Sequence, residues 1–289
     1  MKVKTFKSTL GNSSQSLYFA KVDVKAAFDT IPQNAVMELM NTLTTTSKYR
    51  ISKHVEIKPG EGYRESSGTT KPMRKWTAVA RPPDNSKPFK ENLEDGIAAG
   101  RKNTIFVESI TNQIRDKDEL MVLLDEHVQN NMVKIGKKFY RQKEGIPQGS
   151  VLSSLLCNYF YADLEAKHLQ FLKSGDGILL RLIDDFLLIT TNSSHAKRFL
   201  QIMHDGVPEY GVCVNPDKTL VNFEATINEK KVARLVGSNL FPYCGSFIHT
   251  RTLDITKDRE RKKDMGKYRS NLVMTMLTKW NSNCRFFDC

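Results

Sequence analysis

Two adjacent aspartates, Asp184 and Asp185, lie between two apolar runs in the segment ILLRLIDDFLLIT. Ionised carboxylates beside apolar surface lose hydration and repel each other, so a positive partner must offset their charge. A polar hairpin turn is the alternative interpretation, because Asp is a favoured turn residue. Asp23, in the β-rich segment YFAKVDV, adds a third carboxylate and favours a cation site.

Three acids that converge from separate strands form a set of hard oxygen ligands. With room for water and phosphate, such ligands select Mg²⁺, with Mn²⁺ as the alternative ion. Two ions about 3.5–4 Å apart stabilise the attacking and leaving oxygens in phosphoryl or nucleotidyl transfer. Because successive strand residues point to opposite faces, we expect Asp184 to face Asp23 and Asp185 to lie at the turn. Asp23 and Asp184 are therefore the predicted bridging pair.

The elements that carry these acids follow from periodicity and turn residues. Residues 18–24 form a predicted strand, which a turn connects to a helix from residue 30. The segment GIPQG at residues 145–149 predicts a tight turn before a helix from Ser150 to about residue 173. The acids at 184 and 185 form the tip of a predicted hairpin. Further predictions are helices at 116–135 and 196–204, short strands at 212–223 and 240–248, and a basic helical tail from residue 256.

Composition limits the class of protein and of partner. The 289 residues contain 44 Lys and Arg against 32 Asp and Glu, a formal net charge of +12 that predicts a polyanionic partner. No run approaches the ~18 apolar residues of a membrane span, and the first residues lack a secretory signal, so no membrane partner is expected. The 5 cysteines have no C-x-x-C spacing, which favours free thiols in a reducing compartment.

Five segments together carry a resemblance to a known family: KVDVKAAFDTIPQ, EGIPQGSVLSSLLCNYFYADLE, LLRLIDDFLLIT, VNPDKTLVNF and LFPYCGSF. In this order they resemble the palm motifs of reverse transcriptases, and more narrowly those of telomerase reverse transcriptases. The narrower resemblance rests on the leucine and isoleucine before the aspartate pair, on VPEYG at 207–211 and on FPYCG at 241–245. The spacer at 33–144 resembles the insertion in the fingers domain of that family. The match extends from Tyr18 to about residue 255.

The resemblance implies an α+β fold, namely a right-hand polymerase palm with an antiparallel sheet backed by helices, plus a helical and loop-rich insertion. A loose lead-in is expected before order begins near Leu17. The implied organisation is a lead-in at 1–16, the first palm motif at 17–32, the insertion at 33–144, the remaining palm motifs at 145–255, and the start of a thumb or a linker at 256–289.

Catalytic roles follow from the same resemblance. Asp23, Asp184 and Asp185 would be the metal-binding catalytic triad, holding two Mg²⁺ ions. Lys218, in the segment VNPDKTLVNF, would donate a proton to the departing pyrophosphate or steady its charge. An exposed surface lysine is the alternative interpretation for Lys218.

Nucleotide contacts are implied at four positions. Phe28 would lie against the sugar and exclude a 2′-hydroxyl, with Val24 beside the nucleotide; a core aromatic is the alternative for Phe28. Gln148 and Gly149 would lie beside the nucleotide and template, because glycine lets backbone approach closely and a helix N-terminus at Ser150 favours negative charge. A plain helix entry is the alternative there.

The primer grip is implied at Tyr243, Cys244 and Gly245, where ordinary packing is the alternative. Arg181 is expected to pair with an acid or a phosphate. Residues 48–90, with 11 Lys and Arg against 4 Asp and Glu, are expected to be loop-rich. With Tyr63 and Trp76 they would suit contact with the backbone of an RNA:DNA hybrid, although a charged run is also typical of a solvated face.

The implied function is that of a telomerase catalytic subunit, an RNA-directed DNA polymerase that adds deoxynucleotides to a telomeric DNA 3′ end. The implied partners are a telomerase RNA template, telomeric single-stranded DNA and deoxynucleoside triphosphates, in the nucleus at the chromosome telomere. The alternatives are the reverse transcriptase of a non-LTR retroelement or a group II intron, and a non-catalytic scaffold that binds nucleic acid.

The sequence departs from the family pattern at both ends. Two basic fingers motifs have no counterpart before the first aspartate, an amino-terminal RNA-binding domain has none either, and the thumb would only be beginning where the sequence stops. We therefore expect a palm-plus-insertion fragment that keeps its metal site, extends a primer poorly by itself, and associates with itself through surfaces made to pack on the missing fingers and thumb.

Overall fold

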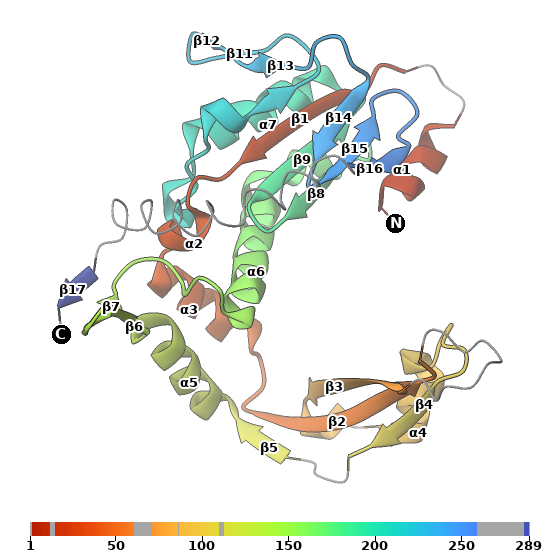
Figure 1. Cartoon of the computed structure of the whole chain (residues 1–289), viewed down its shortest axis with the longest axis vertical. Coiled ribbons are helices and arrows are strands. Elements are labelled where there is room, and N and C mark those ends of the chain that lie inside the picture. The colour runs from red at the N-terminus through yellow and green to blue at the C-terminus, as the bar shows by residue number, and fades with distance from the viewer. Residues whose placement is uncertain are drawn as a thin grey trace. The chain divides into compact units, whose positions relative to one another are not determined.

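The computed structural model describes residues 2–11, 15–60, 71–85, 87–109, 113–258 and 286–288 (Figure 1). The chain divides into two compact units, a larger unit of Met1–Leu39 and His127–Cys289 and a smaller unit of Met40–Glu126. The helices of the described residues are α1 (Lys2–Leu10), α2 (Ala27–Thr30), α3 (Gln33–Leu43), α4 (Phe89–Asn92), α5 (Lys117–Gln129), α6 (Val151–His168) and α7 (Ser193–Asp205).

The strands alternate with these helices and with short 3₁₀ turns. The turns span Pro83–Asn85, Gln170–Ser174, Pro208–Tyr210 and Pro216–Lys218, and a π-helical turn spans Leu93–Ile97. The strands are β1 (Tyr18–Asp23), β2 (Lys48–Lys58), β3 (Met73–Arg81), β4 (Ile105–Glu108), β5 (Gln113–Asp116), β6 (Met132–Ile135), β7 (Lys138–Gln142), β8 (Gly177–Leu182), β9 (Asp185–Thr190), β10 (Leu220–Val221), β11 (Thr226–Ile227), β12 (Lys230–Lys231), β13 (Ala233–Arg234), β14 (Leu240–Tyr243), β15 (Ser246–His249), β16 (Ile255–Lys257) and β17 (Phe286–Asp288).

The central sheet of the larger unit has the strand order β13-β10-β1-β9-β8. β1 lies between β10 and β9 and is antiparallel to both, and β8 and β9 form the predicted hairpin. In a separate sheet, β14-β15-β16, residues 240–249 form a second hairpin where a single short strand at 240–248 was expected. The α+β architecture with antiparallel sheets is therefore confirmed.

Both faces of the central sheet are covered, which explains why β9 is a continuous apolar run. One face packs against α1 and the β14–β15 hairpin, and the other against α6 and α7. Figure 1 shows α7 alongside β1 in the larger unit. The first face shares a buried core of Val3, Phe6, Leu17, Phe19, Leu187, Ile189, Phe241, Ile248 and Leu253.

The predicted helix after GIPQG is confirmed as α6, which begins after its N-cap Ser150. The Ser150 side chain accepts a hydrogen bond from the Leu152 N–H and so satisfies one of the free donors of the first turn. The helix ends at His168, and the 3₁₀ turn that follows it accounts for the longer predicted extent.

The expected loose lead-in is wrong for the described part of residues 1–16, because Lys2–Leu10 forms helix α1. Val3 and Phe6 lie one turn apart and are both buried against the sheet. A segment as short as α1 is not stable as an isolated helix, so packing of its apolar side against the sheet must stabilise it.

Two other predicted helices also differ. The helix expected at 116–135 ends at Gln129, and Met132–Ile135 instead pairs with Lys138–Gln142 as a hairpin. Gly136, with φ of +63°, provides the turn between these strands. At the start of the expected tail, Ile255–Lys257 forms strand β16 against β15, and the rest of that prediction lies outside the described residues apart from β17.

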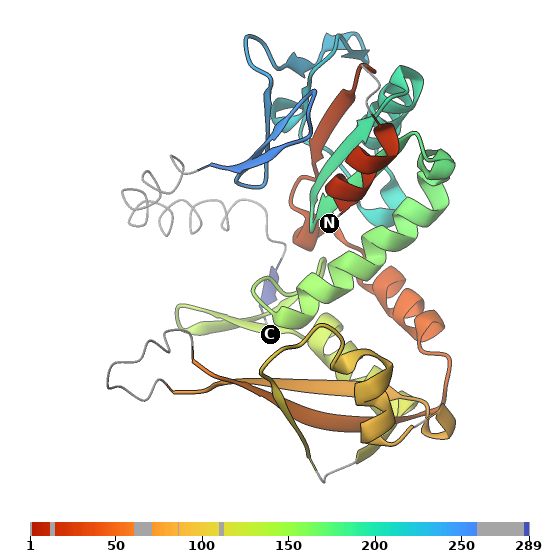
Figure 2. The same cartoon turned by 90° about the vertical axis from the view of Figure 1, so that its right-hand side faces the viewer.

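The smaller unit is built on a sheet rather than on loops. β2 is its central strand, paired with β3 on one side and with β4 and β5 on the other, all antiparallel. Helix α4 covers one side of this sheet (Figure 2). The basic region that was expected to be loop-rich therefore carries strands β2 and β3. Among the described residues, no helix combines the length and apolar character needed to cross a membrane.

Candidate active site

Asp23 and Asp185 lie opposite each other where β1 ends and β9 begins. Residues directly opposite in an antiparallel pair have side chains on the same face. The expectation that Asp184 takes this position is wrong, because the hairpin turn uses two residues, Ile183 and Asp184, and β9 begins only at Asp185.

The turn that carries the acids is held in an unusual conformation. Ile183 has φ of +58°, a left-handed value that a β-branched residue rarely adopts and that costs about 1–3 kcal/mol. The Val24 N–H donates to the Asp184 carbonyl oxygen at 3.2 Å, so the end of β1 is tied to this turn. The strain and the backbone bond together fix where the carboxylates lie.

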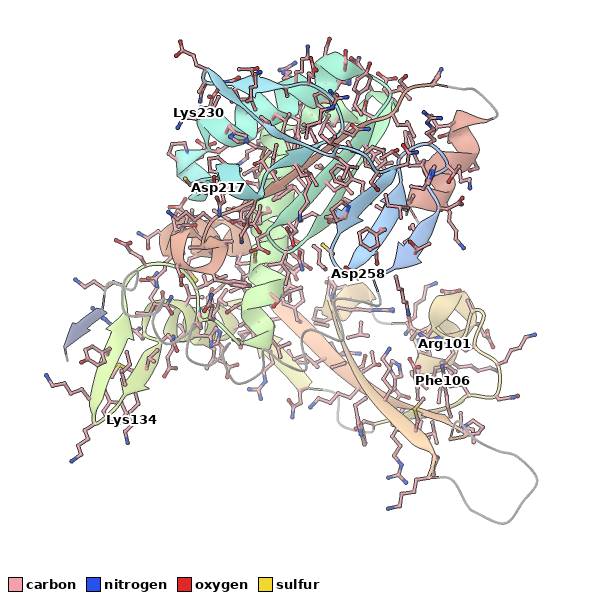
Figure 3. All side chains as sticks on the ribbon, turned by 45° about the horizontal axis from the view of Figure 1, so that its top comes forward. Arg101, Phe106, Lys134, Asp217, Lys230 and Asp258 are labelled. Atoms are coloured by element: carbon pink, nitrogen blue, oxygen red, sulfur yellow. The ribbon has the colours of Figure 1, made fainter. Side chains whose placement is uncertain are left out.

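Lys218 forms an ion pair with Asp23, with 2.9 Å between Nζ and Oδ2. The lysine belongs to the 3₁₀ turn Pro216–Lys218, which Asn215 caps and which contains Asp217 (Figure 3). The Asn215 N–H donates to the Asp23 carbonyl oxygen at 2.9 Å, which places the turn beside the end of β1. The hydrogen bond to Asp23 raises the pKa of Lys218. Residues 195 positions apart thus meet, as the sequence predicts for Lys218 and the acids.

The β14–β15 hairpin contacts Asp185 through its turn. The Tyr243 hydroxyl donates to the Asp185 carbonyl oxygen at 3.1 Å, and Cys244 Sγ lies 3.7 Å from Asp185 Oδ2. Cys244 and Gly245 both have positive φ, as a two-residue type I′ hairpin requires. Burial raises the pKa of Cys244 to about 11, and the nearby Asp185 charge adds to the shift. The predicted primer-grip residues therefore adjoin the predicted catalytic acids.

The electrostatics of the carboxylates favour a cation. Burial raises the pKa of Asp184, and the negative charges of Asp185 and Asp23 raise it further. Among the described residues, however, no group of three or more acidic, histidine or cysteine side chains is arranged so that it could hold a metal ion by itself. The donor set fits an open site, because Mg²⁺ is usually held by one or two carboxylates and completed by water and phosphate oxygens.

Arg181 connects the acid-bearing hairpin to α6. Its Nε lies 2.5 Å from Glu165 Oε1, and its two terminal nitrogens donate to the side-chain and backbone oxygens of Asn158 at 2.7 and 3.0 Å. The guanidinium also lies over the ring of Phe186, with 5.7 Å from Cζ to the centroid. The expected partner of Arg181 is thus an acid within the chain. Glu165 and Asn158 belong to the quoted palm segment, but nothing in their spacing indicated this role.

Phe28 lies on α2, whose backbone is closely approached by two glycines, Gly145 and Gly211. A Cβ on Gly145 would clash with the Phe28 carbonyl oxygen, and a Cβ on Gly211 would clash with the Thr30 carbonyl oxygen. The Ile146 N–H donates to the Phe28 carbonyl oxygen at 2.7 Å. The segments GIPQG and VPEYG therefore fix the short helix that carries the predicted sugar contact.

Gln33 is a positioning residue that the sequence reasoning did not single out. Its side-chain amide donates to the carbonyl oxygens of Val128 at 3.1 Å and Gly145 at 2.9 Å. One side chain therefore joins the start of α3 to the end of α5 and to the loop before α6. Its place at the end of the segment KVDVKAAFDTIPQ was the available signal.

The other predicted nucleotide contacts differ in exposure. Gln148 and Gly149 are exposed, whereas Val24 is buried, with its N–H given to the Asp184 carbonyl oxygen. Gly149 has φ of +86°, which favours glycine, and a Cβ at this position would meet no atom within 4 Å. Ser150 Oγ also lies 3.1 Å from His127 Nε2, which ties the entry of α6 to α5.

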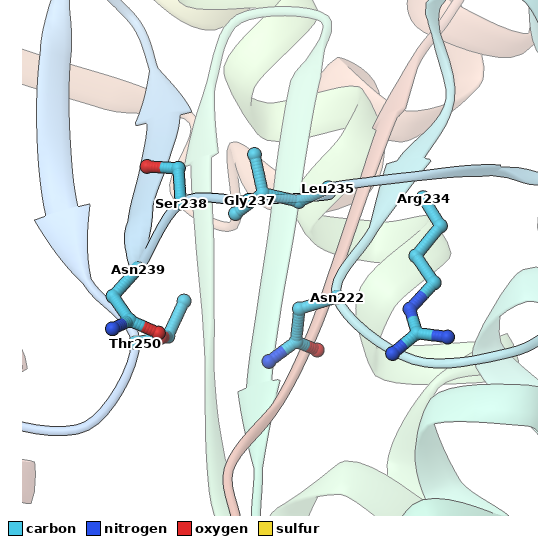
Figure 4. Close-up of a pocket in the computed structure, with 7 residues that line it drawn as sticks. All are labelled: Asn222, Arg234, Leu235, Gly237, Ser238, Asn239 and Thr250. Atoms are coloured by element: carbon cyan, nitrogen blue, oxygen red, sulfur yellow. The ribbon is translucent and has the colours of Figure 1, made fainter.

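A pocket of 330 Å³ lies at the other end of β1 (Figure 4). One of its lining residues, Asn222, accepts a hydrogen bond from the Phe19 N–H and donates to the Leu17 carbonyl oxygen. None of the predicted site residues lines it; the lining residues are Asn222, Arg234, Leu235, Gly237, Ser238, Asn239 and Thr250. The hydrogen bonds of Asn222 therefore hold the start of β1, at the end opposite to the carboxylates.

Solved structures with a similar fold are telomerases. Apo telomerase from Candida tropicalis aligns with a TM-score of 0.57 and 22% identity, over 89% of this chain and 35% of that chain. Telomerase from Candida albicans in complex with a TWJ fragment of telomeric RNA aligns with a TM-score of 0.56 and 21% identity, over 89% and 34%. At these identities the likeness supports the fold.

Sequence comparisons agree with the motifs. Residues 107–245 match the family model "Reverse transcriptase (RNA-dependent DNA polymerase)". Telomerase reverse transcriptase of Rattus norvegicus is 34% identical over 253 residues, which cover 84% of this chain and 22% of the rat protein. That of Takifugu rubripes is 33% identical over 260 residues, 87% of this chain and 24% of the fish protein. The chain thus spans less than a quarter of these relatives, and it belongs to the telomerase reverse transcriptase family.

Proposed function

We propose that this chain is the nucleotidyl-transfer core of a telomerase reverse transcriptase, which adds deoxynucleotides to the 3′ end of telomeric DNA on an RNA template. The observation that carries the proposal is the meeting of Asp23, Asp185 and Lys218 at the ends of β1 and β9. Two carboxylates with an adjacent ammonium group form a set that nucleotidyl transfer requires, with acids for metal ions and a proton donor for the leaving group.

Two Mg²⁺ ions would be held by Asp23, Asp185 and Asp184, with water and triphosphate oxygens completing their coordination. When bound, the ions would lower the negative charge that develops on the attacking and leaving oxygens. An open, partly protein-coordinated site suits this role because a substrate must supply the remaining ligands. Mn²⁺ is the alternative ion for the same oxygens.

The remaining roles belong to side chains around these acids. Lys218 releases Asp23 and turns its ammonium group toward the pyrophosphate, to donate a proton or neutralise charge. Phe28 excludes a 2′-hydroxyl from the nucleotide sugar by its bulk. The Cys244–Gly245 turn positions the primer end, since the hairpin that carries it is bonded to Asp185 through Tyr243. Gln148 and Gly149 lie exposed at the entry of α6, where backbone N–H groups favour phosphate.

An RNA template and a nuclear location at the telomere complete the proposal. A related telomerase of Candida albicans was solved with a fragment of telomeric RNA, which supports an RNA partner for this chain. The net charge of +12 is consistent with a partner that carries many phosphates. Segments of the relatives that lie outside the aligned range would supply further contacts to template, primer and triphosphate.

Two measurements test the function. Calorimetric titration with Mn²⁺ should show binding to the wild-type chain that is lost in Asp185→Asn and retained in Asp118→Asn, an exposed acid in α5. A DNA primer paired with an RNA template should gain single deoxynucleotides slowly, and Asp23→Asn should abolish the addition. Equal ion binding by wild type and Asp185→Asn would support a non-catalytic scaffold instead.

A further inference from the structure

The sheet of the smaller unit has one face that no described element covers. We define this open face by the residues that alternate with the covered ones along β2 and by their partners on the neighbouring strands. It consists of Ile51, Lys53, Val55 and Ile57 of β2, Arg74, Trp76, Ala78 and Ala80 of β3, and Ile105 and Val107 of β4.

The opposite face is packed in the ordinary way. His54 is buried, and its ring lies 5.6 Å from that of Phe89 on α4. Glu56 is also buried and pairs with Arg101, with 2.7 Å between Nη1 and Oε2. Phe106 is the register partner of Glu56 and shares this face; Figure 3 labels Arg101 and Phe106. The covered face is therefore the one that stabilises the unit.

Large apolar side chains on the open face meet solvent. Trp76 is 71% exposed, Ile105 65% and Val107 46%. Ala78 and Ala80, also exposed, leave space beside the Trp76 ring on the same strand. Only Val55 is buried, because it lies between its register partners Trp76 and Val107. A contiguous exposed apolar surface of this kind marks an interaction site.

Charge on the sheet is divided between its faces. The acids of the four strands, Glu56, Glu108 and Asp116, all fall on the covered side of the register. Lys53 and Arg74 fall on the open face. Arg115 of β5 falls on the same face, because it is the register partner of Tyr49, which alternates with the covered residues of β2. Among the described strand residues the open face therefore carries three cations and no acid, and one of the three, Arg115, is paired with Glu119 of α5 at 3.1 Å. An apolar surface with this charge is complementary to a polyanion that has flat apolar groups.

We propose that the open face binds single-stranded DNA, with a base stacked on Trp76 and the backbone phosphates near Lys53 and Arg74. An unpaired strand exposes base faces that an aromatic ring and aliphatic side chains cover, and this stacking tolerates any base sequence. Arg74 lies two residues from Trp76 on the same face, about 7 Å along the strand, within reach of the phosphate next to a stacked base.

The aliphatic surroundings favour DNA over RNA. Ile57, Ile105 and Val107 border the Trp76–Val55 pair and present hydrocarbon to a sugar. A deoxyribose fits hydrocarbon at its C2′ position, whereas a ribose would have to desolvate its hydroxyl there. No carboxylate among the described strand residues of this face could accept a hydrogen bond from a 2′-hydroxyl.

Fluorescence anisotropy of labelled dT20 with the full 289-residue chain tests the proposal. Trp76→Ala should weaken binding about 5- to 150-fold, the range measured for loss of one stacking aromatic. Trp76→Phe, which keeps a flat ring, should recover most of the affinity. In a Trp280→Phe background, where Trp76 is the remaining tryptophan, dT20 should quench the emission.

Two double variants, each reversing two positive charges but on opposite faces of the same strands, provide the control. Lys53→Glu with Arg74→Glu reverses two charges on the open face, and Lys58→Glu with Lys75→Glu reverses two on the covered side of the same strands. The first pair should weaken dT20 binding and reduce its salt dependence; the second should have a much smaller effect. Circular dichroism checks that all variants fold, and the measurement does not depend on catalysis.

Several outcomes would overturn the proposal. They are an absence of dT20 binding at low salt, equal losses from the two double variants, and unchanged affinity in Trp76→Ala. Binding of rU20 as tight as that of dT20 would assign the face to RNA instead. Self-association that Trp76→Ala abolishes, without any loss of dT20 binding, would assign it to a protein partner.

Discussion

At the scale of single residues, the proposed active site has a lysine ammonium group paired with one of its carboxylates. The Lys218 side chain is 60% exposed whereas that of its partner Asp23 is 14% exposed, so solvent screens this ion pair from the lysine side and keeps it modest in strength. A ligand that brings its own cations can therefore displace the lysine at small cost. In the proposed mechanism, the lysine is then free to interact with the leaving group.

Lys218→Met should raise affinity for Mn²⁺ and lower the rate of nucleotide addition. Removing the ammonium frees Asp23, and an exposed pair contributes at most about 1 kcal/mol, so the gain in affinity should be no more than about fivefold. Calorimetry measures the first effect and primer extension the second. A loss of ion affinity in this variant would show that the lysine supports the ion site instead of competing with it.

Arg181 is the residue whose replacement should most disturb the hairpin. Its side chain is 11% exposed and makes charge-assisted bonds that a lysine cannot reproduce in this geometry. Arg181→Lys should lower the free energy of unfolding by about 2–3 kcal/mol. Urea unfolding measures the change, and Arg198→Lys, an exposed arginine over Phe171, should cost less than about 1 kcal/mol. Similar losses in both variants would contradict the role assigned to the clamp.

At the scale of elements, local patterns predicted hairpins and long helices better than they predicted contacts between elements. The apolar–Asp–Asp–apolar segment indicates the β8–β9 hairpin by itself, whereas residues 240–248, expected as one short strand, turn back at Cys244 and Gly245 to form a second hairpin. The pairing of Asp23 with Asp185 could not be predicted, because it depends on a hairpin turn in which Ile183 adopts a left-handed backbone conformation. A β-branched side chain does not favour that conformation. Helix α1 was missed for a similar reason, since its burial exists only against the folded sheet.

Strands β2 and β3 were missed because charged residues occur on both of their faces, so apolar and polar residues do not alternate clearly along them. In MRKWTAVAR the positions of the open face are Arg, Trp, Ala and Ala, and the leading arginine and the low strand propensity of alanine weaken the strand pattern. The covered face keeps its buried His54 and Glu56, polar residues that an apolar pattern search passes over. Only the register shows that these residues belong to one sheet with two unlike faces.

Gly211 and Gly149 offer a matched test of the elements around Phe28. Both have positive φ, but only Gly211 approaches backbone, at Thr30. Gly149→Ala should cost about 1–2 kcal/mol from backbone strain alone. Gly211→Ala should cost about 1–3 kcal/mol more, because Thr30 must move. Urea unfolding of the two variants measures the difference, and equal costs would mean that the contact at Thr30 contributes nothing.

At the scale of the whole molecule, the first and last strands of the smaller unit, β2 and β5, are hydrogen-bonded neighbours in its sheet. Lys48 and Asp116 are register partners in β2 and β5, and the Lys117 N–H donates to the Ser47 carbonyl oxygen at 2.7 Å. The chain therefore enters and leaves this sheet at one place. The contacts of Gln33 and His127 with the loop before α6 lie entirely within the larger unit.

Replacing residues 49–115 by Asn-Gly should leave the larger unit folded. The two ends are already adjacent, and Asn-Gly suits a two-residue hairpin turn. The shortened chain should unfold cooperatively and keep its Mn²⁺ binding, while dT20 binding should fall as it does in Trp76→Ala. Loss of cooperative unfolding, followed by circular dichroism in urea, would show that the larger unit needs the deleted sheet.

This paired entry and exit also bears on how such a protein can change over generations. Because the sheet of the smaller unit begins and ends at one paired position, insertions, deletions and surface mutations in it need not move the carboxylates of the proposed active site. The surface of this sheet can therefore vary among related proteins while the arrangement of Asp23 and Asp185 stays the same.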